Sequence, residues 1–239
     1  MAGFAGTLAA GSSQALLRLQ DKAQLGEHTS LATGGQLASV NGIHLATGRA
    51  LTSNGNASIL GTFTNNGAVS GSGGALTFLN DVNGAGSYAG NVIFRAGYSP
   101  GNSPSTIHHG GGDVTFDATS VLTMEILGNA AGSQHDQLAG IDQLTFNGRL
   151  SVVFGNGFAP SSASFQLFSF QSFAGSFAPD RIDVSGFDRA RLDFSQLGQD
   201  GTLSVTAVPE PGSYAMMLAG LGLMGFMVWR WRGARVALG

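Results

Sequence analysis

Short runs in which apolar and polar residues alternate recur along most of this chain, and they limit the folds open to it. Alternation with a period of two turns one side of a strand towards a core. Turn-forming dipeptides such as Asn54-Gly55 and Asn147-Gly148 separate the runs, and no helical periodicity competes with them. The region is therefore predicted to be all-β. Examples of the alternating sets are Leu76/Phe78, Val92/Phe94, Leu122/Met124/Ile126 and Leu150/Val152/Phe154.

Two all-β architectures fit this pattern. A β-solenoid stacks each strand on the previous coil and places small residues at the corners. A β-sandwich would pair the same runs as hairpins through X-Gly turns. Only 10% of the residues are charged and one is a lysine, so the edges of an open sheet would be weakly protected. We expect a parallel β-helix (β-solenoid) body, with the β-sandwich as the alternative.

The first 26 residues differ in pattern from the strand-like region. Residues 12–25 contain helix-favouring side chains, with Ser12 or Ser13 as an N-cap and Gly26 as a stop. Residues 1–10 are mildly apolar but lack the basic start of a secretory signal. We expect residues 1–26 to form an N-terminal segment, either a short helix or a truncated export signal. Residues 27–207 would then form the β-solenoid-like domain.

Composition excludes some classes of protein. The chain has no cysteine, so neither disulfides nor thiolate metal sites contribute to its fold. Residues 1–207 contain eight basic and thirteen acidic side chains, a net charge of −5. Nucleic-acid binding requires a basic patch, so no nucleic-acid partner is expected.

The C-terminal segment, residues 208–239, contains three consecutive signals. Val208, Pro209, Glu210 and Pro211 form a stiff motif, because the two prolines fix φ and remove two backbone donors. An uncharged apolar stretch begins at Gly212, and an arginine cluster closes the segment. The cluster consists of Arg230, Arg232 and Arg235.

This order predicts a single C-terminal transmembrane helix. Twenty helical residues extend about 30 Å, close to one hydrocarbon thickness. Tyr214 lies at one end and Trp229 and Trp231 at the other, where interfacial aromatic residues are common. The arginines act as a topological stop and predict a cytoplasmic C-terminus, which places the rest of the chain outside the cytoplasm. The alternative is a buried core helix that is apolar on all sides.

Together these residues resemble the PEP-CTERM sorting signal of Gram-negative bacteria, with Val208–Pro211 as its motif. The resemblance implies export, recognition by an exosortase, removal of the tail, and release or attachment at the cell surface. An exosortase is an integral-membrane, cysteine transpeptidase-like enzyme. The resemblance indicates a location and gives no activity.

Residues 55–207 resemble a module of PEP-CTERM and autotransporter-passenger-like exported proteins. The resemblance implies a right-handed parallel β-helix or a related β-rich surface domain, and it supplies no catalytic residues. The sequence departs from the module at His135, where a tyrosine is common. The matching pieces are residues 66–73, 97–104, 134–138 and 156–160.

Few residues suggest chemistry. His108 and His109 are adjacent on an expected strand and should point to opposite faces, so they cannot easily chelate one ion. The segment 110–114 resembles a calcium repeat, but it occurs once. We therefore assign no metal, no cofactor and no catalytic residue. A mixed patch of Asp180, Asp183, Asp188 and Asp193 with Arg181, Arg189 and Arg191 is interpreted as a solvated face.

We therefore expect a non-enzymatic, exported surface or extracellular-matrix protein with a structural or adhesive role. It would be processed by an exosortase and associated with exopolysaccharide in a biofilm. It would be held in the inner membrane by its C-terminal helix before processing. One alternative is a polysaccharide lyase or hydrolase on the same scaffold. Another is a carbohydrate- or calcium-binding module.

Overall fold

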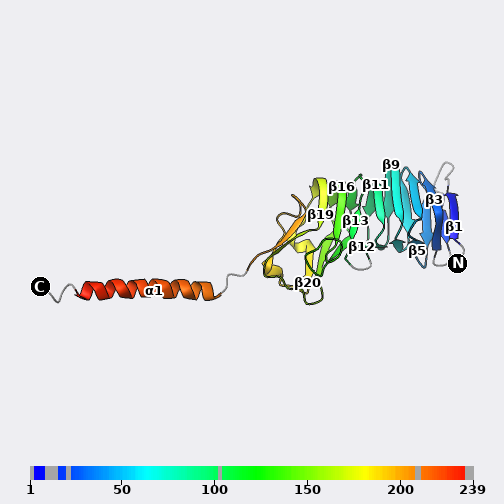
Figure 1. Ribbon diagram of the computed structural model, residues 1–239. Helices are drawn as coiled ribbons and strands as arrows, with labels where there is room; N and C mark the ends of the chain where they lie inside the picture. Colours follow the sequence, from blue (N-terminus) through cyan, green and yellow to red (C-terminus); the bar gives the residue numbers. More distant parts are fainter. Residues whose placement is uncertain (1–2, 9–15, 20–22, 102–103, 208–210, 235–239) are drawn as a thin grey trace. The chain divides into compact units, whose positions relative to one another are not determined.

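The computed structural model describes residues 3–8, 16–19, 23–101, 104–207 and 211–234. The chain divides into two compact units, Met1–Thr206 and Ala207–Gly239. The first unit is a ladder of strands, and the second contains one helix (Figure 1).

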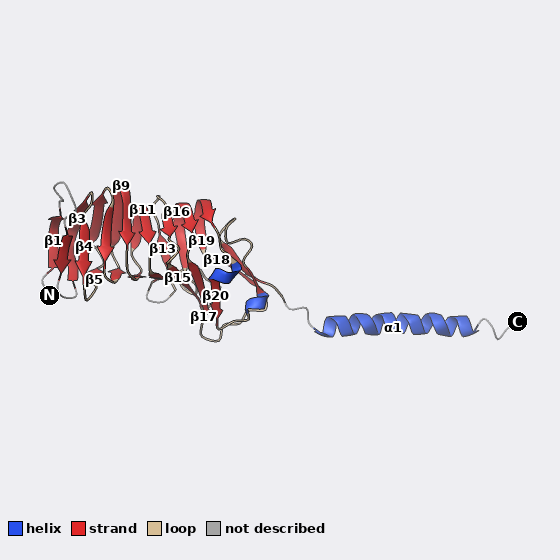
Figure 2. Cartoon of the chain, turned by 180° about the vertical axis from the view of Figure 1, so that it is seen from behind, coloured by secondary structure: helices blue, strands red, loops and turns tan. Residues whose placement is uncertain are grey.

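Parallel pairing builds the first unit. Every strand pair of its large sheet is parallel, and each strand lies on one from the preceding coil. Figure 2 shows these strands stacked side by side along the unit. This arrangement is that of a parallel β-helix, as the sequence predicted. A β-sandwich would require antiparallel hairpins, so that alternative is wrong for the large sheet.

The coils have three faces, and long strands bend from one face to the next. The first face consists of β2 (Leu16–Leu19), β4 (Gln36–Ser39), β7 (Ala57–Leu60), β14 (Val114–Phe116), and the ends of β9 (Ala68–Phe78), β11 (Ser87–Phe94), β16 (Gln137–Phe146) and β19 (Phe168–Gly175). The second face consists of the start of β3 (Ala23–Ala32), β5 (Ile43–Leu45), β8 (Phe63–Asn65), β10 (Val82–Gly84), β12 (Gly97–Pro100), β15 (Val121–Ile126), β17 (Arg149–Phe154) and β20 (Ile182–Ser185). The third face consists of β6 (Ala50–Asn54), β13 (Thr106–His108), the ends of β1 (Gly3–Leu8) and β3, and the starts of β9, β11, β16 and β19.

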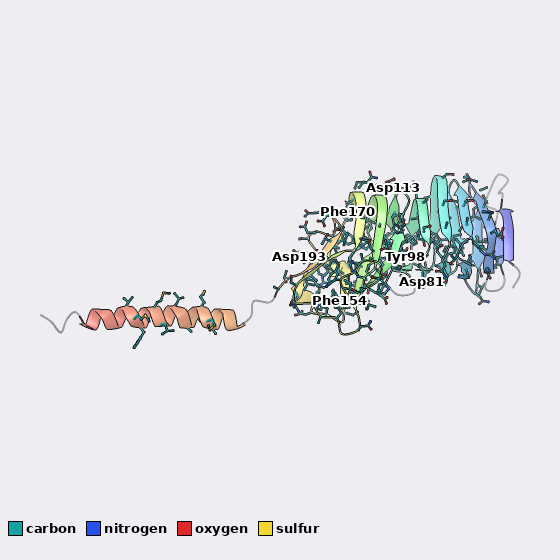
Figure 3. The ribbon with its side chains drawn as sticks, in the orientation of Figure 1. Asp81, Tyr98, Asp113, Phe154, Phe170 and Asp193 are labelled. Atoms are coloured by element: carbon teal, nitrogen blue, oxygen red, sulfur yellow. The ribbon has the colours of Figure 1, made fainter. Side chains whose placement is uncertain are left out.

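The alternating apolar residues form the core, because one side of each strand faces the inside of the coil. A column of phenylalanines runs along the inner side of the first face. Phe94 has its ring centroid 5.3 Å from that of Phe78 and 5.2 Å from that of Phe116, with nearly parallel planes. Tyr98, labelled in Figure 3, belongs to the second face. Its ring stacks on that of Phe94, with 4.3 Å between the centroids. Such offset contacts add about 0.5–1.5 kcal/mol per pair beyond burial.

Coil length varies along the β-helix. Leu76 pairs with Val92, 16 positions further on, whereas Val114 pairs with Leu144, 30 positions further on. Side chains at the corners connect successive coils by accepting hydrogen bonds from backbone N–H groups of the next coil. These contacts are Asn56 Oδ1 with Ala75, Asp81 Oδ1 with Gly97, and Asn91 Oδ1 with Asp113, each 2.9 Å long.

The last coil is covered by a small antiparallel sheet. It is formed by β18 (Ala163–Gln166), β22 (Thr202–Val205) and β21 (Leu192–Asp193). Two 3₁₀-helices flank β20, η1 (Pro179–Arg181) and η2 (Arg189–Arg191). Phe165 of β18, Leu203 of β22 and the adjoining Leu167 are fully buried. The sheet therefore closes this end of the core.

The helix predicted for residues 12–25 is wrong wherever this segment is described. Leu16–Leu19 and the residues from Ala23 onwards are strands, and Leu17 pairs with Leu37 of the next coil. Residues 12–15 and 20–22 lie outside the described residues. Stacking on an existing coil outweighs a weak local preference for helix.

Candidate functional site

The C-terminal unit contains α1 (Pro211–Ala234). Pro211 is its first residue, a favourable position because proline has no N–H to leave unpaired and its φ suits a helix. Val208, Pro209 and Glu210 of the predicted sorting motif lie outside the described residues. Arg230 and Arg232 belong to α1, and Arg235 lies outside the described residues.

The surface of α1 is apolar. Between Ala215 and Val228 every side chain is uncharged, and Met216 and Leu218 are 76% and 65% exposed. The apolar side chains lie on all sides of the helix rather than on one stripe. A helix of this kind is stable in an apolar environment rather than at the surface of a globular domain.

The structure confirms that the predicted segment forms a helix, but it does not confirm that this helix spans a membrane. Within the stretches that the structure describes, no helix is both long and apolar enough to cross a membrane.

In the β-helix the most unusual ionisable group is Asp136, which the sequence did not single out. Its side chain is fully buried. One carboxylate oxygen accepts the N–H of Ser105 at 2.9 Å and the other accepts the N–H of Glu125 at 2.8 Å. Burial raises the pKa of Asp136 to about 7, although the two N–H groups favour the charged form and oppose this shift. Asp136 therefore connects the segment before β13 to β15.

His135 supports the same turn. Its ring is buried, its Nδ1 lies 3.3 Å from the carbonyl oxygen of Gly128, and it packs edge-on against Phe165. Burial lowers the pKa of His135. The segment at 134–138, noted for its resemblance to exported proteins, thus holds neighbouring parts of the β-helix together.

A second buried polar group lies inside the third face. The imidazole of His109 is 3% exposed, and neither of its nitrogens makes a hydrogen bond to a described residue. The hydroxyl groups of Tyr88 and Tyr98 are also buried and make no hydrogen bond of normal geometry to a described residue. Burial raises the pKa of both tyrosines, and it lowers the pKa of His109 to about 4. These side chains are neutral at neutral pH.

The predicted opposition of His108 and His109 is confirmed, since His108 is exposed and His109 is buried. Within the described part of the chain, no three histidine, aspartate or glutamate side chains are grouped closely enough to hold a metal ion. The assignment of no metal stays a prediction.

The mixed-charge patch lies at the end near the small sheet. Asp180, Asp183 and Asp193 are exposed, and Asp183 forms an ion pair of 3.1 Å with Arg149. The guanidinium of Arg191 lies 4.9 Å from the ring centroid of Phe187. The exposed side chains and the ion pair describe a solvated surface rather than an enclosed site.

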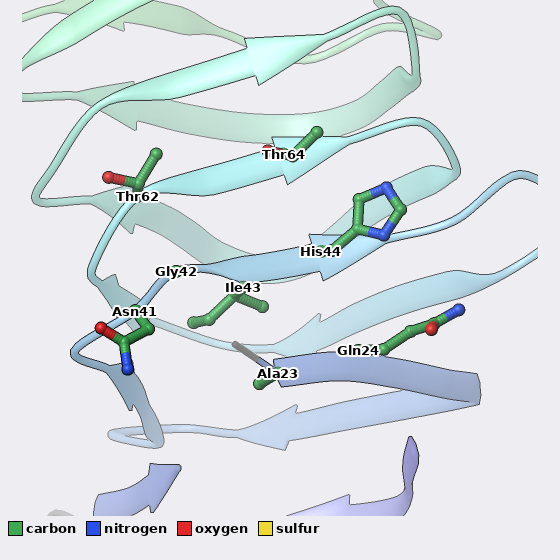
Figure 4. Close-up of a pocket in the computed structure, with 8 residues that line it drawn as sticks. All are labelled: Ala23, Gln24, Asn41, Gly42, Ile43, His44, Thr62 and Thr64. Carbon is green, nitrogen blue, oxygen red and sulfur yellow. The ribbon is translucent and has the colours of Figure 1, made fainter. Parts of the chain in front are cut away.

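A pocket of about 490 Å³ opens on the second face, near the N-terminal end of the β-helix. Gln24, His44 and Thr64 line it from three neighbouring strands, β3, β5 and β8 (Figure 4). Ala23 and Ile43 supply an apolar part of the lining. Ligand sites have volumes of this order and combine an apolar lining with a few polar groups. Sequence patterns alone do not reveal this site, because only the register of the strands brings the three side chains together.

Comparison with known proteins identifies one segment. Residues 207–233 match the PEP-CTERM protein-sorting motif, so the predicted sorting signal is confirmed at that position. The motif supports export of the chain and its sorting by an exosortase. No curated protein and no solved structure shows a significant match to the chain.

Proposed function

We propose that this protein is a structural or adhesive component of the cell exterior, placed there by an exosortase that acts on its C-terminal tail. The observation that carries the proposal is the pairing of a PEP-CTERM motif at residues 207–233 with a separate β-helical unit that ends at Thr206. The motif determines the destination, and the β-helix is the cargo. The tail would be removed after the unit has left the cytoplasm.

The cargo suits a structural role. Its coils are held together by parallel ladders and by a continuous apolar core from Leu25 to Val205. The chain has no cysteine, so this cohesion comes from burial and backbone hydrogen bonds rather than from disulfides. Its long faces expose small polar side chains, which suits association with hydrated exopolysaccharide in a biofilm.

A catalytic role has less support. Asp136, whose pKa burial raises to about 7, has no exposed surface, and its two oxygens accept hydrogen bonds from backbone N–H groups. A general acid has to reach its substrate directly or through one water molecule. Asp136 therefore serves the fold, and we propose that the protein is not an enzyme.

The test replaces both prolines of the motif. The chain is produced with an exosortase, the cells are fractionated, and the mature C-terminus is determined by mass spectrometry. We expect the wild-type chain to lose the tail and the double variant Pro209→Ala/Pro211→Ala to retain it. Pro179→Ala, in the exposed 3₁₀-helix η1, is the matched control and should be processed normally. Normal processing of the double variant would refute the proposal.

A further inference from the structure

One row of outward side chains on the second face differs from the equivalent rows elsewhere. The strand register places Gln24 beside His44 and His44 beside Thr64. The same register continues along the face, and Ser99 and Thr123 lie one position beyond the paired residues Tyr98 and Leu122. Every position in the row carries an amide, an imidazole or a hydroxyl group. The members after Gln24 are His44, Thr64, Asn83, Ser99, Thr123 and Ser151.

The row is uninterrupted and almost uncharged. Neighbouring strands are about 4.8 Å apart, so the row from Gln24 to Ser151 extends over about 29 Å. It ends beside Asp183, which is paired with Arg149. The equivalent row of the first face is broken by Ile93, which lies between Thr77 and Thr115. The second face therefore presents the longer continuous polar strip.

The polar groups of the row are available to a ligand. His44 Nε2 lies 3.3 Å from the Asn66 side-chain nitrogen. The side chains of the other members, from Gln24 to Ser151, make no hydrogen bond to another described residue, and all are partly exposed to solvent. The corner residues Asn56, Asp81 and Asn91, in contrast, are engaged with backbone N–H groups. The row contributes little to the cohesion of the coils.

These features select one class of ligand. A protein partner would be expected to meet aromatic or arginine anchors, which the row lacks. A polyanion would meet a body with a net charge of −5 over residues 1–207. A neutral polysaccharide presents hydroxyl groups at a regular spacing along an extended chain, and the row offers donors and acceptors at regular spacing.

We propose that this row binds a neutral polysaccharide chain laid along the β-helix, with its first contact in the pocket formed by Gln24, His44 and Thr64 (Figure 4). The inference rests on the proposed function, since it names the ligand that an exported matrix protein would hold. The lack of an outward aromatic ring in the row means that many weak hydrogen bonds, rather than stacking, supply the affinity.

The test is affinity electrophoresis of the purified full-length chain in detergent, in gels that contain hydroxyethylcellulose as the neutral probe or alginate as the anionic probe. The row variant is Thr64→Val/Thr123→Val. The matched control is Thr77→Val/Thr115→Val on the first face. Valine keeps the shape of threonine and favours strands, so both variants should fold. Asn83→Ala/Ser99→Ala repeats the test with other members of the row.

We expect hydroxyethylcellulose to retard the wild-type chain. The row variant should bind roughly tenfold more weakly, because each lost hydrogen bond weakens binding about threefold. The control should bind like the wild type. Absence of retardation, equal weakening in both variants, or retardation by alginate alone would each overturn the inference. Processing of the tail is measured separately on the same variants, so loss of sugar binding with normal processing leaves the proposed function standing.

Discussion

The imidazole of His109 stacks on the ring of Tyr88, with 5.2 Å between their centroids and 12° between their planes. Both rings lie inside the β-helix and neither is charged at neutral pH. The contact therefore depends on His109 remaining unprotonated. The free-energy cost of keeping His109 unprotonated should appear in the pH dependence of stability.

Acid should weaken the fold through His109. The pKa of His109 is lowered from 6.5 to about 4, mainly by burial and further by the charge of His108. Below pH 6.5 the unfolded chain binds a proton that the native state excludes until about pH 4, so stability is lost as the pH falls through this window. His109→Phe, which keeps the stacked ring, should reduce that loss. Thermal unfolding at pH 7 and pH 4 measures it.

The control is His28→Gln, which removes an exposed histidine from the same face. It should lose as much stability as the wild type between pH 7 and pH 4. If His109→Phe shows the same acid sensitivity as this control, the buried imidazole is not the responsible group.

Asp136 should act in the opposite direction. Its pKa is raised from 3.8 to about 7, so the native state holds a proton that the unfolded chain releases. Its contribution to stability is present below pH 4 and is lost as the pH rises towards 7. Asp136→Asn should abolish this slope and lower stability at every pH, because its amide can accept only one of the two N–H bonds from Ser105 and Glu125.

Chemical denaturation at a series of pH values between 4 and 8 tests this expectation. Asp180→Asn, which removes an exposed carboxylate, provides the comparison. A variant Asp136→Asn whose stability still falls with rising pH as steeply as that of the wild type would contradict it.

The sequence predicted the composition of the core better than its geometry. Alternating pairs such as Leu76 with Phe78 point inwards as expected, and α1 forms where the apolar stretch lies. Alternation shows which side of a strand is buried but not which coil it joins. The separation between paired residues of the large sheet ranges from 16 positions, for Leu76 and Val92, to 32 positions, for Leu150 and Ile182, so the register could not be read from spacing.

The same limit explains why the candidate sites were not predicted. Gln24, His44 and Thr64 form one pocket only because their strands are in register. Asp136 lies in a segment that looks polar and solvated, and its burial comes from contacts with residues 11 and 31 positions away. The helix expected at residues 12–25 failed for the same reason, because pairing with the next coil decides the conformation of Leu16–Leu19.

The aromatic column should be the main source of cohesion between the middle coils. Phe94 is 1% exposed and contacts Phe78, Tyr98 and Phe116 from three other strands. Phe94→Ala should lower the free energy of unfolding by about 3–5 kcal/mol, because the lost burial of the ring and the cavity left behind both destabilise the fold. Phe94→Leu keeps most of the volume and should cost much less. Denaturant unfolding of both variants measures the difference, and equal losses would show that the volume filled by this side chain is not what holds these coils.

Whether a corner glycine can be replaced should depend on the space around its Cα as well as on its backbone conformation. Gly48 and Gly90 allow these two effects to be compared. Gly48 and Gly90 have nearly the same positive φ, 77° and 78°. A Cβ at Gly48 would meet nothing within 4 Å, whereas a Cβ at Gly90 would overlap the carbonyl oxygen of Gly71 in the preceding coil. Gly48→Ala should therefore cost about 1–2 kcal/mol, the strain of a left-handed conformation alone.

Gly90→Ala carries the same strain and must in addition push two coils apart, because the atom it meets is backbone and cannot rotate away. The coils are close-packed, so the displacement would spread to the hydrogen bonds between Gly90 and the Gly111 carbonyl and between Gly110 and the Tyr88 carbonyl. In urea unfolding we expect Gly90→Ala to lower the free energy of unfolding at least twice as much as Gly48→Ala. Similar losses in the two variants would mean that backbone conformation, rather than the close approach of successive coils, makes glycine necessary at Gly90.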